Sequence, residues 1–245
     1  MIGGSYRPDG NQPRLVDALL IGREAAAAVD SGSVFPRCVI PDLRDYAERV
    51  QAAKINRAEY PIDLHSFPGD GSLWKAWVTP YDTSASIWHP DELETDDAWF
   101  RVVIAKEIMH IVFDLPSEYV VDLRVHIEAI LGDVDLATLL RADGPTVGEA
   151  KMARVCSAVR AERHVMCAAV EYLMPTDARP SAKEFAVSRD IAGIAAKFGL
   201  PPKIVEDWYT VGFAQHADDL PYVPVRRASD PSRGTGVDRP ATILS

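Results

Sequence analysis

One helical segment constrains this chain more than any other feature of its sequence. Residues 96–114 (DDAWFRVVIAKEIMHIVFD) repeat apolar side chains at helical spacing, with acidic residues in the first turn and a proline just beyond the end. Lys106 and His110 fall on the same stripe as Trp99 and Val103, so both are expected to point toward the interior. The fold therefore has to accommodate a lysine and a histidine inside its most apolar helix.

The run Lys106-Glu107-Ile108-Met109-His110 has the layout of the zinc motif H-E-x-x-H, with lysine replacing the first histidine. In the intact motif both histidines reach one Zn²⁺ ion from a single helical face, and the glutamate acts as general base for the metal-bound water. Lysine is a poor ligand at neutral pH because its amine must first lose a proton, from a pKa of about 10.4. Burial can lower that pKa, so coordination by Lys106 stays open.

A second long helix, expected over about residues 147–174, contains an inward carboxylate. Its residues spaced alternately by three and four are apolar with one exception: Met152, Val155, Val159, Glu162, Met166, Ala169 and Leu173. A carboxylate in a buried stripe is costly unless a cation or several donors meet it, so Glu162 requires a partner. His164 lies about 200° further around the helix, and we therefore interpret Glu162 as the inward residue.

The remaining chain predicts an α+β fold. Helical spacing covers residues 15–29, 42–58, 182–198 and 202–213, while residues 60–89 hold three short runs of β-branched and aromatic residues separated by turn sequences. We expect these runs to form a small antiparallel three-stranded sheet. The aromatic cluster Trp74, Trp77, Trp88 and Trp99 is interpreted as core between sheet and helix, with a substrate groove along the sheet edge as the alternative.

The domain organisation follows from the same reading. A single domain is expected over residues 14–215, preceded by a flexible arm at 1–13 and followed by an extended or mobile tail at 216–245. The formal charge of −10 argues against nucleic acid as a direct partner. Three cysteines without CxxC spacing and the lack of a secretory signal favour the cytoplasm, and apolar stretches too short for a transmembrane helix argue against a membrane.

The two helical motifs together resemble the ImmA/IrrE family of regulatory metallopeptidases. Members typically have a short sheet, a helix reading roughly R-F-x-x-A-H-E-x-x-H, and a helix reading E-x-x-A-N-x-F-A-x-x-L-L-M-P. Residues 99–110 (WFRVVIAKEIMH) and 162–175 (ERHVMCAAVEYLMP) match these two helices, and residues 194–200 (IAAKFGL) resemble a segment that often follows. The similarity covers about residues 40–213. It departs at Lys106 and at Val165-Met166, which replaces Ala-Asn.

The resemblance implies a zincin-like helical core in which His110 and Glu162 bind zinc, Glu107 is the catalytic base, and Lys106 stands at the position of the missing ligand. It further implies a regulator in a bacterial or phage-related cell that cleaves a DNA-binding repressor. Lysine at position 106 predicts an impaired zinc site, in which a Zn²⁺ ion is either still bound or absent.

Three functional interpretations stay open at this point. The first is a metallopeptidase with an unusual ligand set or a substituted ion. The second is a pseudo-peptidase that binds a protein partner, in which the Lys106 ammonium pairs with Glu162 or Glu107 in place of the metal. The third is a plain helical interaction domain, which predicts that Glu162 is exposed and far from His110.

Overall fold

The computed structural model describes residues 15–29, 35–69, 76–113, 162–210 and 212–220. Its elements before the central gap are α1 (Leu15–Ala28), η1 (Val39–Leu43), α2 (Arg44–Lys54), β1 (Ile62–Phe67), β2 (Trp77–Pro80), β3 (Ala85–Pro90), η2 (Asp91–Thr95) and α3 (Asp97–Phe113). After the gap come a helix at 162–173, α7 (Ala182–Ser188), α8 (Ile191–Phe198), α9 (Pro202–Thr210) and α10 (Phe213–Asp218). The mixed α+β class is confirmed.

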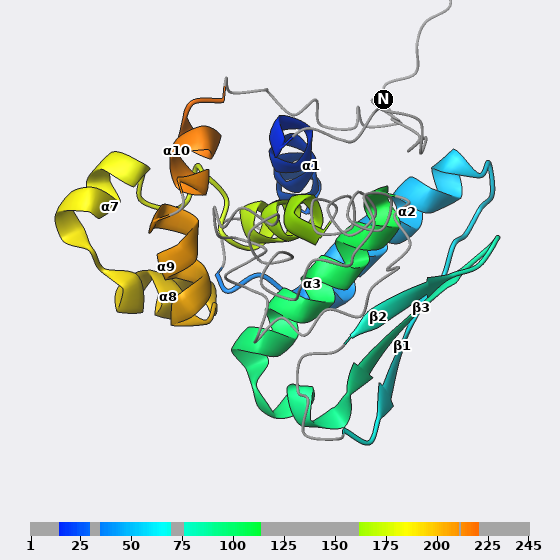
Figure 1. The fold of residues 1–245 in the computed structure, drawn as a ribbon. Coiled ribbons are helices and arrows are strands. Elements are labelled where there is room, and N and C mark those ends of the chain that lie inside the picture. Colours follow the sequence, from blue (N-terminus) through cyan, green and yellow to red (C-terminus); the bar gives the residue numbers. More distant parts are fainter. Residues whose placement is uncertain (1–14, 30–34, 70–75, 114–161, 211, 221–245) are drawn as a thin grey trace, which may run out of the picture.

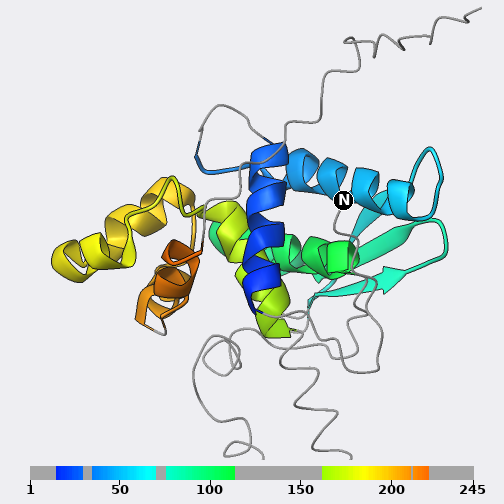
Figure 2. The same ribbon diagram turned by 90° about the horizontal axis from the view of Figure 1, so that it is seen from above.

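Helix α3 runs through the middle of the molecule, with the sheet on one side and α7–α10 at the opposite end (Figures 1 and 2). All of its residues from Val102 to Phe113 are buried, so it is covered on every face and not along one stripe. Its last carbonyls lack partners within the helix. Two side chains of α2 provide hydrogen-bond partners for these carbonyls. Lys54 Nζ donates to the Val112 oxygen at 2.7 Å, and Gln51 Nε2 donates to the Ile111 oxygen.

The sheet is mixed, so the expected antiparallel sheet is wrong in one of its two pairings. The strand order is β1-β3-β2, in which β3 pairs antiparallel with β2 and parallel with β1. The β2–β3 turn brings the Tyr81 amide within 2.8 Å of the Ser84 oxygen, as its turn sequence predicts. Because β3 then inserts between β1 and β2 instead of continuing a meander, it runs in the same direction as β1.

The two faces of the sheet differ in burial. Ile62, Val78 and Ile87 are buried, and α3 packs against β2 and β3. On the other face, Trp88 stacks on His65 with ring centroids 4.5 Å apart and on Trp77 at 6.3 Å. These two tryptophans are only half-buried, so their interpretation as core between sheet and helix is wrong. They form a cross-strand ladder on the outer face instead.

The other two tryptophans of the expected cluster have different outcomes. Trp99 is half-buried at the start of α3 and packs against the core, as expected. Trp74 lies outside the described residues.

The remaining helices follow the expected ranges with local differences. The range 182–198 is divided into α7 and α8 because Arg189 adopts a left-handed conformation with φ of 49°. Of the range 147–174, residues 162–173 are helical, and residues 147–161 are not described. Helix α10 reaches Asp218, past the expected start of the tail at 216. None of the described helices combines the length and apolar character needed to span a membrane.

Helix α1 approaches helix 162–173 at Gly22, which is buried. A Cβ atom at this position would lie 2.5 Å from the carbonyl oxygen of Ala168 and 2.9 Å from Cβ of Glu171. The first of these neighbours is backbone and cannot move aside without displacing the helix. The two helices can therefore pack at this distance only because residue 22 has no side chain.

Gly22→Ala is expected to lower the free energy of unfolding by about 1–3 kcal/mol, because overpacking at a backbone contact outweighs the better helix propensity of alanine. Urea unfolding of the two chains measures the difference. Ala27→Leu, at an exposed position of the same helix, is the matched control and should change stability by less than about 0.5 kcal/mol. Equal stability of the Gly22→Ala and unmodified chains would show that the helices separate freely.

Candidate functional site

Four ionisable side chains meet in the core where α3 packs against helix 162–173. Lys106 Nζ lies 2.7 Å from Glu162 Oε2 and 2.9 Å from Glu107 Oε1, and His110 Nε2 lies 3.1 Å from Glu162 Oε1. Each residue exposes 3% of its surface or less. The expected pairing of Lys106 with a buried carboxylate is therefore confirmed. The third interpretation predicts that Glu162 is exposed and far from His110, and this prediction is wrong.

Local helix geometry explains why these residues converge. Lys106 and His110 are one turn apart and share a face of α3, so both reach across the helix interface. Glu162 begins the described part of the opposing helix, where Met166, Ala169 and Leu173 continue its buried stripe. Met152, Val155 and Val159, the preceding members of the expected stripe, lie outside the described residues. His164 is half-buried, as expected for a residue that points away from the Glu162 stripe.

Opposite charges dominate the electrostatics of this cluster. Burial opposes the charge of Lys106, but the carboxylates of Glu107 and Glu162 outweigh it and raise the lysine pKa above its ordinary value. Burial likewise opposes ionisation of Glu162, yet Lys106 and His110 outweigh it and lower the pKa of this carboxyl to about 2. In Glu107 burial prevails over Lys106 and raises the pKa. The charged pair at the centre is thus Lys106 and Glu162.

Hydrogen bonding differs between this ion pair and the two residues beside it. Lys106 donates a hydrogen bond to Glu162. Both carboxylate oxygens of Glu107 and both ring nitrogens of His110 are buried without a hydrogen-bond partner among the described residues. Unsatisfied buried polar atoms are uncommon in folded proteins. Glu107 and His110 therefore keep unused hydrogen-bonding capacity next to a satisfied ion pair.

The donor set does not fit a zinc ion in this arrangement. A protonated lysine has no lone pair to offer, and its ammonium contacts both Glu162, the expected ligand, and Glu107, the expected base. Within the described ranges, no three His, Cys, Asp or Glu side chains are placed to hold one metal ion. The ammonium supplies the positive charge, and the second carboxylate oxygen of Glu162 contacts His110.

Two of the other histidines lie on the strands. His65, on the edge strand β1, stacks on Trp88 of the central strand β3. His89 is buried at the end of β3, where its Nδ1 lies 3.2 Å from the Pro90 oxygen and its Nε2 lies 3.8 Å from Glu94 Oε1. Both histidines thus contact residues of β3 or of η2, which directly follows it.

Sequence reasoning missed a second buried carboxylate on the same helix. Glu171 is fully buried, and its Oε1 accepts from Arg23 Nε at 3.0 Å and from the hydroxyl of Thr176 at 2.7 Å. Burial raises its pKa, against the opposing effect of Arg179, Thr176 and Arg23. Glu171 lies off the inward stripe and would be assigned to the surface, but α1 covers that side of the helix. The one signal in the sequence is Arg23, the single cation of α1.

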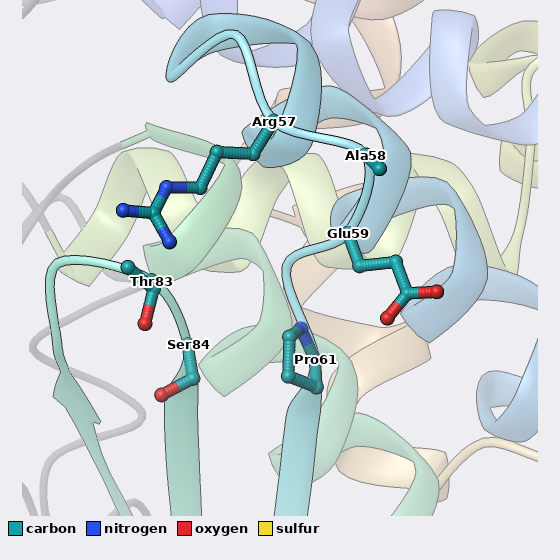
Figure 3. Close-up of a pocket in the computed structure, with 6 residues that line it drawn as sticks. All are labelled: Arg57, Ala58, Glu59, Pro61, Thr83 and Ser84. Atoms are coloured by element: carbon teal, nitrogen blue, oxygen red, sulfur yellow. The ribbon is translucent and has the colours of Figure 1, made fainter.

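A shallow hollow at the surface is separate from the buried cluster (Figure 3). It lies between the loop that precedes β1 and the turn that precedes β3. Its lining residues are Arg57, Ala58, Glu59, Pro61, Thr83 and Ser84. None of these lining residues belongs to the Lys106 cluster.

Glu162→Gln is expected to lower the free energy of unfolding by about 3 kcal/mol near neutral pH, because it leaves Lys106 without its charged partner. The folded-state pKa of about 2 lies below the ordinary 4.5, so this contribution is complete above pH 4.5 and is lost as the pH falls toward 2. The raised pKa of Glu107 makes its own contribution to stability fall as the pH rises, but this residue is present in both chains. Urea unfolding should show a stability difference that shrinks in acid, and a difference independent of pH would contradict the pairing.

Comparisons with known proteins supply no function with which to interpret this geometry. No model of a protein family matches the chain, and no curated protein matches it. The resemblance in the two helical motifs thus stays a prediction, and any function has to be argued from the contacts themselves.

Proposed function

We propose that this chain is an ImmA/IrrE-like regulatory protein in which a metallopeptidase-like pair of helices binds a protein partner without cleaving it. The observation that carries the proposal is the position of Lys106 Nζ, 2.7 Å from Glu162 and 2.9 Å from Glu107. The ammonium contacts both carboxylates that the resemblance assigns to zinc binding and general base catalysis.

Metal-dependent hydrolysis requires a Lewis acid with an open coordination position and a carboxylate free to accept a proton from water. An ammonium ion offers no coordination position. The Glu107 carboxylate is fully buried and contacts Lys106, so it is not placed to activate a water molecule. Binding through the outside of the same fold requires neither group, which favours the pseudo-peptidase over the metallopeptidase.

The resemblance also suggests the class of partner, a DNA-binding repressor in the cytoplasm. Such proteins carry basic surfaces for phosphate contacts. The chain has 26 Lys and Arg against 36 Asp and Glu, and its formal charge of −10 complements a basic partner electrostatically. Direct nucleic-acid binding is disfavoured by the same charge.

Metal content tests the impaired site. We expect the unmodified chain to purify with little zinc, and Lys106→His to take up close to one zinc per chain, because the substitution restores two histidines one turn apart beside Glu162. Plasma mass spectrometry of both proteins, prepared identically, measures the ratio. Lys106→His combined with Glu162→Gln is the matched control and should lose the metal. Near-stoichiometric zinc in the unmodified chain would instead establish the metallopeptidase interpretation.

Incubation with candidate repressors tests the binding role. We expect an intact complex in size-exclusion chromatography, weakened as salt concentration rises because the partners attract through opposite net charge. Mass spectrometry of the mixture should find the repressor uncut. Cleavage that disappears in Glu107→Gln would overturn the pseudo-peptidase proposal, as would failure of every candidate to bind.

A further inference from the structure

We propose that Glu107, Glu162 and His110 form a preorganised cation-binding site, which the ammonium group of Lys106 occupies. When this side chain is shortened, the chain binds a primary alkylammonium ion in its place. The proposal goes beyond the proposed function, because it concerns what the buried centre binds and not what the protein regulates. The contacts that carry it hold whatever the ancestry of the chain.

The first support is the balance of charge. Glu162 exposes 3% of its surface and Glu107 none, so both carboxylates are removed from water. A buried carboxylate without a positive neighbour is strongly destabilising. Lys106 is the cation in contact with both, at 2.9 and 2.7 Å. The core at this point is therefore organised around one positive charge.

The second support is the geometry of the contacts. The 2.7 Å contact with Glu162 is a charge-assisted hydrogen bond from the ammonium group, and the 2.9 Å contact with Glu107 is an ion pair. The carboxylates come from different helices, so the ion bridges α3 and helix 162–173. His110 Nε2 contacts the other oxygen of Glu162 at 3.1 Å.

The third support is the shape of the space. Lys106 is 2% exposed and is among the largest fully buried side chains of the described residues. Replacing it with alanine keeps Cβ and removes three carbons and the nitrogen, which together have the form of n-propylammonium. Protein interiors relax only partly around a deleted side chain, so much of this volume should persist as a cavity. The cavity would end at the two carboxylates that held Nζ.

Thermal unfolding of Lys106→Ala tests the site. We expect the melting temperature to fall by roughly 10 °C relative to the unmodified chain. n-Propylammonium chloride at millimolar concentration should recover a substantial part of that loss. Sodium chloride and tetramethylammonium chloride at equal ionic strength should not, because neither ion combines the alkyl chain with N–H donors. An equal response to all three salts would overturn the proposal.

Lys106→Met is the matched control, since it fills much of the same volume without charge. It should be less stable than the unmodified chain and should not respond to n-propylammonium, because the space is occupied. A Lys106→Met chain as stable as the unmodified one would show that the carboxylates need no cation. This comparison also keeps the proposal testable where Lys106→Ala does not fold.

Zinc chloride added to Lys106→Ala separates an ammonium site from a metal site. Stabilisation by zinc with no effect of n-propylammonium would overturn the assignment of an ammonium site. The outcome is independent of the proposed function. Rescue by n-propylammonium in a protein that binds no repressor would support the cation site and contradict the regulatory role. Repressor binding without rescue by n-propylammonium would support the regulatory role and contradict the cation site.

Discussion

The ion pair between Lys106 and Glu162 joins the two helices at the centre of the molecule. Neither charge is tolerable in the core alone, because desolvation of an unpaired ion costs more than the surrounding apolar contacts return. Their 2.7 Å contact therefore restricts how α3 and helix 162–173 can slide or rotate against each other. A shift of one residue in either helix would move its charge away from the partner and leave two buried ions unpaired.

Helix 162–173 makes such a contact on both of its sides. Glu162 and Glu171 are nine residues apart, which is about two and a half turns, so their side chains point in opposite directions. Glu162 meets Lys106 of α3, while Glu171 accepts from Arg23 of α1 at 3.0 Å. On the α1 side the close approach at Gly22 brings the backbones together beside this second pair. The helix is thus fixed between two neighbours by one ion pair on each face, buried on the α3 side and partly buried on the α1 side.

Patterns within one helix were sufficient to predict most of this centre. The bounds of α3, the shared face of Lys106 and His110, and the buried stripe of Glu162 follow from spacing alone, because a helix places residues three and four apart on one face. The sheet order could not be predicted, since the runs of residues 60–89 do not specify which strand inserts between the others. The tryptophans illustrate the same limit: alternation assigns Trp77 and Trp88 to one face, but only the position of α3 decides that this face is the outer one. Glu171 was missed for the related reason that its covering helix lies far away in sequence.

In the proposed pseudo-peptidase, a lysine at the position of a metal ligand preserves one property and removes another. The ammonium keeps a positive charge between the helices, so the packing that depends on this charge is retained. It does not coordinate a water molecule as a Lewis acid, because it has no vacant orbital and its hydrogen bond goes to Glu162. Since those carboxylates raise the lysine pKa above its ordinary value, the side chain stays protonated throughout the neutral range. A centre of this kind therefore stabilises the packing of the two helices through a charge that is present at every neutral pH.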